Sequence, residues 1–310
     1  MRPCLLLATK RDTQDGQFVE KREGKSERSK EVTKERRGEE RKIVRQIERN
    51  MSKSTLELTA LIDKSPTYLT YHGKLNNEPV MIKRPTCEDS VAKSGREVKI
   101  LQDLGRKEDI VCLLEHFIDN TLPFSGETNK TYLCYQFMCR DLQNVLMASP
   151  APELDIDALL ISMATCLSYV HEKGYMHRDI KSANIFLDQT GKAQLGGFDL
   201  ACKYSNSEEL TPETGTYRWM APEIIRHEPY DNSADVYSFG ILMFECYVKE
   251  IPYSSMNAVV AAYTVAKENL RPTIRIDLNP RKKAIMKRCW LDDAASRPSF
   301  EDLICLLKSV

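Results

Sequence analysis

The stretch that decides the fold, residues 177–187, reads His177-Arg178-Asp179-Ile180-Lys181-Ser182-Ala183-Asn184-Ile185-Phe186-Leu187. It places a carboxylate at Asp179, an ammonium at Lys181 and an amide at Asn184, and it closes with an apolar run. A carboxylate can accept the proton of a hydroxyl, an ammonium can neutralise a phosphate, and an amide oxygen can bind magnesium. This loop can therefore carry phosphate and metal chemistry.

The apolar pattern on either side of this loop predicts strands and helices in separate parts of the chain. Apolar residues recur at three- and four-residue steps over 156–173, which is the period of a helix. Further helices are predicted at 90–104, 233–248 and 280–290, and strands at 65–74, 79–83 and 131–138. A small strand-rich part followed by a larger helical part is an α+β plan.

The loop at 177–187 resembles the catalytic loop of protein kinases. Val80–Lys83 is similar to the strand that carries the ATP-anchoring lysine of that family, and Glu97 stands where its helical partner is expected. Further matches in order are Gly215–Glu223 (end of the activation segment), Asp235–Gly240 (the supporting helix), Cys289-Trp290 and Ser296–Phe300. The last two resemble the tyrosine-kinase-like group, which includes Raf-like and mixed-lineage kinases.

The resemblance covers roughly residues 55–310 and implies a two-lobed protein kinase fold. The N-lobe is expected at about 55–138 and the C-lobe at about 139–310. Glu223 and Arg297 are expected to form a buried ion pair, as the matching residues do in the family. Ser205, Ser207, Thr211 and Thr214 of the activation segment are either phosphorylation sites or ordinary loop hydroxyls.

The resemblance also implies a role for each matching site residue. Asp179 becomes the catalytic base and Lys181 steadies the γ-phosphate, which also suggests Ser/Thr rather than Tyr specificity. Asn184 holds magnesium, and Lys83 pairs with Glu97 and grips the α- and β-phosphates of ATP. The hinge residues Gln136 and Met138 hold ATP. Tyr135, just before the hinge, is bulky and narrows the rear of the ATP pocket. The alternatives are a structural Asp179 that caps loop amides and a Lys83–Glu97 pair that only fixes a helix.

The loop that should cover the phosphates departs from the family pattern. Its three glycine positions fall on Asp63, Ser65 and Tyr68. Glycine lets backbone amides approach phosphate oxygens without a Cβ in the way. Asp63 adds a negative charge there, and Pro66 removes an amide donor. This loop is not expected to cradle phosphate in the usual way.

The metal-binding motif departs as well. The family's Asp-Phe-Gly falls on Gly197-Phe198-Asp199, so a carboxylate stands two residues beyond its usual place. Two extended residues span about 6–7 Å, whereas a magnesium ligand must lie about 2.1 Å from the ion. Asp199 is therefore a metal ligand only if the loop is rebuilt.

These losses predict a pseudokinase or a very weak kinase that acts through protein partners, with weak ATP binding and doubtful use of magnesium. The first alternative is an active Ser/Thr protein kinase with an unorthodox metal site at Asn184 and Asp199. The second is another transferase chemistry on the kinase fold. No loss touches Asp179 or Lys181, so the sequence leaves catalytic activity open.

Charge and cysteine content bound the remaining possibilities. Residues 1–50 hold 15 basic and 10 acidic residues, and the other 260 hold 30 and 35, for a net charge of zero. The composition of residues 1–50 predicts a disordered arm or a solvated helix. This arm is either an interaction tail or a segment without a partner. A further alternative is that the protein starts at Met51. Neither nucleic acid binding nor a membrane span is expected. Ten cysteines without a CxxC pair indicate a reducing compartment, the cytoplasm or the nucleus.

Overall fold

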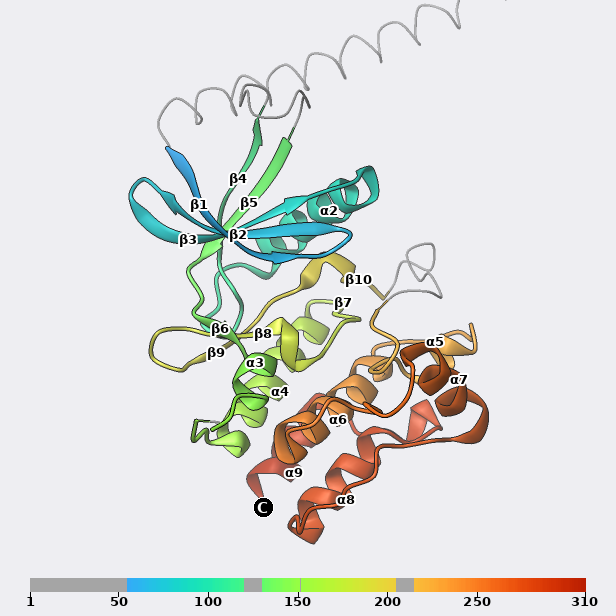
Figure 1. Ribbon diagram of the computed structural model, residues 1–310. Helices are drawn as coiled ribbons and strands as arrows, with labels where there is room; N and C mark the ends of the chain where they lie inside the picture. The colour runs from blue at the N-terminus through green and yellow to red at the C-terminus, as the bar shows by residue number, and fades with distance from the viewer. Residues whose placement is uncertain (1–54, 120–129, 151, 205–214) are drawn as a thin grey trace, which may run out of the picture. The chain divides into compact units, whose positions relative to one another are not determined.

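The computed structural model describes residues 55–119, 130–150, 152–204 and 215–310. Residues 55–310 form one compact unit. Its N-terminal part is an antiparallel five-stranded sheet in the order β1-β2-β3-β5-β4 (Figure 1). The strands are β1 (Leu56–Lys64), β2 (Tyr68–Leu75), β3 (Glu78–Pro85), β4 (Leu113–Asp119) and β5 (Lys130–Gln136).

The first two strands correct the sequence prediction, which began a strand at Ser65. Residues 65–67 are instead the turn between β1 and β2, because Ser65 N donates to Tyr68 O at 2.9 Å. The turn between β2 and β3 lies at Asn76 and Asn77, and both residues have positive φ. Asparagine tolerates that conformation better than most residues, which is why this tight connection forms.

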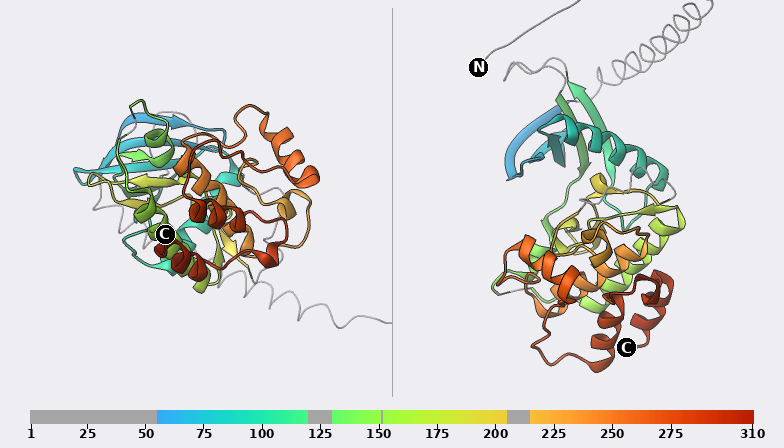
Figure 2. Two further views of the ribbon diagram at one scale, coloured as in Figure 1. Left: turned by 90° about the horizontal axis from the view of Figure 1, so that it is seen from below. Right: turned by 90° about the vertical axis from the view of Figure 1, so that its right-hand side faces the viewer.

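Helix α2 (Glu88–Leu104) packs on one face of the sheet (Figure 2). It starts two residues before the predicted helix, since the Ser90 hydroxyl accepts from the Cys87 amide at 3.0 Å. Its apolar residues Val98, Leu101 and Leu104 are buried. The same face also buries the carboxylate of Glu97, which therefore needs a partner of opposite charge.

The C-terminal part is helical and contains the larger core. Its helices are α3 (Leu142–Leu146), α4 (Ile156–Glu172), α5 (Pro222–Ile225), α6 (Ser233–Val248), α7 (Ala258–Glu268), α8 (Pro280–Cys289) and α9 (Phe300–Lys308). The helices predicted at 156–173, 233–248 and 280–290 correspond to α4, α6 and α8 within one residue at each end. Helix α6 is buried along nearly its whole length and forms the centre of this part.

Short elements between the two parts shape the loop at 177–187. The stretch follows β7 (Tyr175–Met176), contains η1 (Ser182–Asn184) and ends with β8 (Ile185–Leu187). Strand β8 pairs with β6 (Arg140–Asp141) and β9 (Ala193–Leu195), whereas β7 pairs with β10 (Cys202–Lys203). The segment after β9 enters η2 (Phe198–Leu200), and η4 (Ala294–Ser296) precedes α9. The loop that carries Asp179, Lys181 and Asn184 is thus flanked at both ends by paired strands.

Candidate functional site

The predicted catalytic residues lie together in the loop between β7 and β8. The Asp179 carboxylate accepts hydrogen bonds from Lys181 Nζ at 2.6 Å, Asn184 Nδ2 at 2.7 Å and Thr216 Oγ1 at 2.7 Å. Thr216 comes from the activation segment and also accepts from Lys181 Nζ at 2.6 Å. The base, the ammonium and the amide therefore stand in one hydrogen-bonded cluster.

Buried carboxylates of α6 hold this loop in place. Asp235 accepts from the amides of His177 and Arg178, both at 2.8 Å, and from His171 Nε2 at 2.8 Å. Burial works to raise the pKa of Asp235, but the hydrogen bonds and charges of His171 and His177 together outweigh it and the pKa is lowered. Arg178 adopts a φ of 65°. The hydrogen bonds from the two backbone amides to the Asp235 carboxylate help to hold this strained conformation.

Glu245, one turn before the end of α6, is a supporting residue that the sequence prediction missed. Its carboxylate accepts from the amide and hydroxyl of Ser182, at 3.1 and 2.5 Å, and from Trp219 Nε1 at 2.7 Å. Burial raises the pKa of Glu245. A lone glutamate inside an apolar helix was the available signal, because such a charge is buried only with partners.

The predicted Glu223–Arg297 pair is present and buried. The two guanidinium nitrogens of Arg297 donate to the two carboxylate oxygens of Glu223 at 2.6 and 2.8 Å. The side chains are 0% and 6% exposed. This bidentate pair ties the end of the activation segment to the C-terminal helices.

On the sheet side of the site, Lys83 is enclosed by groups of the protein itself. Its ammonium lies 3.1 Å from Glu97 Oε2 and 3.2 Å from Asp199 Oδ1. It also lies 4.0 Å from the ring centroid of Tyr68. Burial alone would lower the pKa of Lys83, but the two carboxylates outweigh it and the pKa is raised. Lys83 therefore stays charged, beside two carboxylates and an aromatic ring.

Tyr68 occupies the third glycine position of the phosphate loop and points inward. Its side chain is 7% exposed, and its hydroxyl donates to the carbonyl of Ser90 in α2 at 3.3 Å. Burial raises the pKa of Tyr68 to about 12. Sequence reasoning identified the lost glycine here, but only the structure places the replacing ring against Lys83.

The turn before Tyr68 uses its amides within the protein. Ser65 N donates to Tyr68 O, and Tyr68 N donates to Ser65 Oγ at 3.0 Å. Thr86 holds the turn from β3, through its amide to Thr67 O at 2.9 Å and its hydroxyl to Pro66 O at 2.6 Å. The amides of Ser65 and Tyr68 are therefore occupied, and Pro66 has no amide hydrogen. Of residues 65–68, these bonds leave the amide of Thr67 for a ligand.

Gly197 and Asp199, at the first and third positions of the altered metal-binding motif, lie beside different residues. Gly197 has a φ of 79°, and a Cβ at this position would lie 2.6 Å from Asn184 Cγ. Asp199 lies in η2 and turns its carboxylate to Lys83. Burial works to raise the pKa of Asp199, but Lys83 outweighs it and the pKa is lowered. An ionised Asp199 already neutralises Lys83.

The site residues fit magnesium poorly. Asn184 faces Asp179 with its nitrogen, through bonds of 2.7 Å to both the backbone and the side chain of that residue, which leaves its amide oxygen for a ligand. The Asp199 carboxylate is engaged by Lys83. Among the described residues no group of three or more His, Cys, Asp or Glu side chains is arranged to hold a metal ion.

A cleft of about 920 Å³ lies between the sheet and the helical part. Its lining includes most of the site residues described above: Tyr68, Lys83, Glu97, Asp179, Lys181, Asn184, Gly197 and Asp199. Met138 lines the cleft, which confirms its predicted place, but Gln136 does not. Successive side chains of a strand point to opposite faces, and its neighbour Tyr135 is the one that faces the cleft. Met81 and Tyr135 are paired in the sheet and face the cleft together. Burial, followed by the charge of Glu97, raises the pKa of the Tyr135 hydroxyl well above its usual value.

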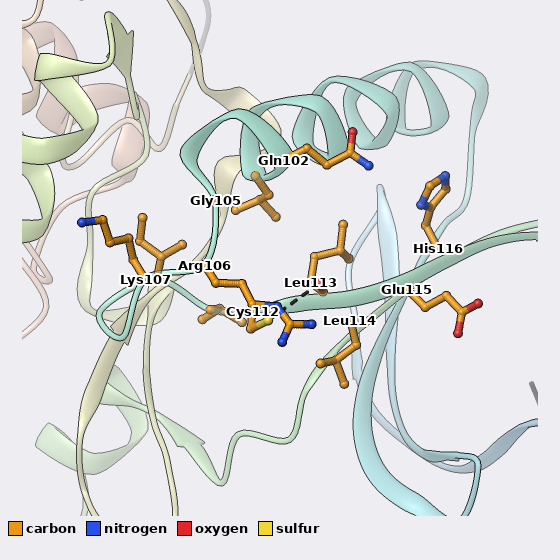
Figure 3. A pocket seen from close by; sticks show the side chains of 12 residues that line it. Gln102, Gly105, Arg106, Lys107, Cys112, Leu113, Leu114, Glu115 and His116 are labelled. Atoms are coloured by element: carbon orange, nitrogen blue, oxygen red, sulfur yellow. Dashed lines mark hydrogen bonds between the residues drawn. The ribbon is translucent and has the colours of Figure 1, made fainter.

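A second hollow, of about 250 Å³, lies between the end of α2 and β4 (Figure 3). Leu113 and Leu114 contribute apolar surface, and Figure 3 shows the Arg106 side chain across Cys112. It contains none of the residues that the sequence analysis selected. The large cleft is therefore the candidate site.

Comparison with known proteins agrees with this geometry. A model of the family described as the protein kinase domain matches residues 68–306. The chain belongs to the protein kinase family. The two-lobed α+β kinase fold and the tyrosine-kinase-like Ser/Thr group predicted from the motifs are thereby confirmed.

Three relatives from Arabidopsis thaliana illustrate the similarity. This kinase domain is 33% identical over 218 residues to the serine/threonine-protein kinase STY17, covering 68% of this chain and 38% of the relative. It is 38% identical over 150 residues to the serine/threonine-protein kinase STY46, covering 48% and 26%. It is 35% identical over 209 residues to the serine/threonine/tyrosine-protein kinase HT1, covering 65% and 54%. The chain thus spans less than two thirds of the length of each relative.

Two expectations from the sequence fall outside the described residues. They are the candidate phosphorylation sites Ser205, Ser207, Thr211 and Thr214 and the charged segment 1–50. In the part of the chain that the structure describes, no helix is long and apolar enough to cross a membrane.

Proposed function

We propose that this protein kinase domain is a pseudokinase, or a kinase of very weak activity, that acts in intracellular signalling by binding protein partners. The observation that carries the proposal is the position of Lys83 between the carboxylate of Asp199 and the ring of Tyr68, in addition to its pair with Glu97. A kinase needs this lysine for the phosphates of ATP. Here its charge is matched by carboxylates of the chain, so phosphate gains little by approaching it.

The residues around the enclosure support the same conclusion. The amides of the turn at 65–68 are used internally, and Asn184 is the one side chain of the usual metal set that keeps its place. Loss of one preorganised electrostatic stabiliser typically lowers a rate by about 10²–10³. Loss of the phosphate loop and of a metal ligand together should cost more than either alone.

Phosphoryl transfer tests the proposal directly. The protein is incubated with radiolabelled ATP, a generic Ser/Thr protein substrate and either magnesium or manganese. We expect the same background in the native protein and in Asp179→Asn, which lacks the base. Transfer that is clearly above background and disappears in Asp179→Asn would overturn the pseudokinase assignment.

The second candidate is an active Ser/Thr protein kinase with a relocated carboxylate at the metal. The cluster of Asp179, Lys181 and Thr216 favours it, because every hydrogen bond in it is 2.6–2.7 Å long. This candidate requires activity that is lost in both Asp179→Asn and Asp199→Asn. Activity that survives Asp199→Asn excludes Asp199 as the metal ligand.

We place the protein in the cytoplasm, with the nucleus as the alternative. The described residues include four free thiols that are buried, Cys134, Cys166, Cys246 and Cys289. Thiols persist in reducing compartments. Fractionation of cells that express a tagged chain tests this; recovery in a secreted or luminal fraction contradicts it.

A further inference from the structure

The strongest unexplained charge on the described surface lies on α8. This helix holds five cations in its ten residues and no acidic residue: Arg281, Lys282, Lys283, Lys287 and Arg288. It lies at the end of the helical part away from the sheet (Figures 1 and 2). Residues 51–310 as a whole carry 30 basic and 35 acidic residues, so α8 is an exception on an acidic body.

The cations gather on the solvent face of the helix. Ile285, Met286 and Cys289 are buried and define the opposite face. At about 100° per residue, Lys283, Lys287, Arg288 and Arg281 follow one another around the exposed face with only Ala284 among them. We call these four residues the α8 cationic face.

The four cations lack acidic partners in the described part of the chain. Among the described residues, the one ion pair of α8 within 4.0 Å joins Lys282 to Asp157. Arg281 donates to the carbonyl of Ser309 at 3.5 Å, which leaves its charge uncompensated. Nearby Asp292 pairs instead with Arg226 and Arg271.

This arrangement opposes two local preferences of a helix. Cations are unfavourable in the first turn, where the helix dipole is positive, yet Arg281 and Lys283 stand there and that turn holds no acidic residue. Lys283 and Lys287 are also like charges at i and i+4, which repel. Local rules broken without compensation within a protein occur where a surface serves a function.

We propose that the α8 cationic face binds an acidic segment of a partner protein, a run of three or four Asp or Glu residues. The seven residue steps from Arg281 to Arg288 rise about 10 Å along the helix, which an extended segment of three or four residues spans at about 3.3 Å each. A membrane is the poorer occupant, because Ala284 is the one apolar residue of this face and offers little to insert. The surface is remote from the cleft, so the inference does not depend on whether the cleft transfers phosphate.

The test uses a fluorescein-labelled octaglutamate peptide and fluorescence anisotropy at about 20 mM salt. The triple variant Lys283→Gln, Lys287→Gln, Arg288→Gln removes three charges from α8. The matched control Lys74→Gln, Arg96→Gln, Lys99→Gln removes three exposed charges from the sheet part. We expect the α8 variant to lose at least about tenfold in affinity and the control less than about twofold, and salt to weaken native binding.

Two outcomes overturn the proposal. Equal losses in both triple variants would mean that only net charge matters. Binding of phosphatidylserine vesicles, but not of the peptide, would assign the face to a membrane. A single variant, Lys283→Glu, tests the local cost separately: we expect weaker peptide binding and a melting temperature raised by roughly 1–3 °C. An unchanged or lower melting temperature contradicts the cost argument.

Discussion

On the helical wall of the cleft, Asp179 accepts hydrogen bonds from three donors of its own chain, whereas on the sheet wall Lys83 contacts the Asp199 carboxylate and the Tyr68 ring. The intact residues each have a structural partner as well as a chemical task. The altered positions, Ser65, Tyr68 and Gly197, are those whose partner in a kinase is the nucleotide or its metal. Under the proposed pseudokinase function, residues that also hold the fold together have stayed in place while those that serve only the nucleotide have changed.

The sharpest test of the structural side of this comparison is Arg297→Ala. It strands the Glu223 carboxylate in a buried site, and breaking such a pair costs about 3–5 kcal/mol. The free energy of unfolding is measured by urea titration. Arg288→Ala is the control, because it removes an exposed arginine and should change stability by about 0.5 kcal/mol or less. Equal stability of the two variants would mean that the pair does not anchor the activation segment.

The next effect concerns Gly197, which marks the altered metal motif. Gly197→Ala should destabilise by about 2–3 kcal/mol, because its positive φ costs about 1–2 kcal/mol and its Cβ meets Asn184. Gly191→Ala is a matched control, with a φ of 84° and no neighbour within 4 Å of the added Cβ. The difference between their unfolding free energies isolates the Asn184 contact. If it is zero, an aspartate at 197 is not blocked by Asn184.

A smaller effect is expected when the ring of Tyr68 is removed. Tyr68→Ala vacates the space over Lys83 and should raise the affinity for ADP without magnesium by about tenfold, or about 1.4 kcal/mol. Isothermal titration calorimetry measures it. Tyr68→Phe keeps the ring and loses only the bond to Ser90, so its affinity should stay within about twofold of the native protein. If Tyr68→Ala gains nothing, the ring is not what excludes phosphate.

The smallest effect is a pH dependence from Asp199. Its pKa is lowered in the folded protein below the ordinary value of about 3.9. Its ion pair with Lys83 therefore stabilises the fold fully above about pH 4, and this contribution is lost as the pH falls through the folded-state pKa.

Acid unfolding of the native protein and of Asp199→Asn, each followed by circular dichroism, measures this contribution. The stability difference between the two proteins should be constant from pH 7 to about pH 5 and shrink below about pH 4. A difference that grows on acidification would show that Asp199 is not held ionised by Lys83.

Much of this protein was determined by the sequence alone, because short-range patterns encode it. The motif at 177–187, the lysine strand and the Glu223–Arg297 match predicted the kinase fold, and helical periodicity located α4, α6 and α8 closely. The lost glycines and the exchanged Gly197 and Asp199 were also visible. Each of these signals is local, since it depends on residue types at fixed spacing.

Only the tertiary structure decided what fills the space that those losses leave. Tyr68, Glu97 and Asp199 come from three elements, and no spacing rule indicates that all three meet at Lys83. The same holds for Asn184 beside Gly197 and for Glu245 below Ser182 and Trp219. A buried charge requires a partner, but its desolvation cost is met by whichever groups the packing brings within reach. That choice depends on contacts between distant parts of the chain, which a single sequence does not specify.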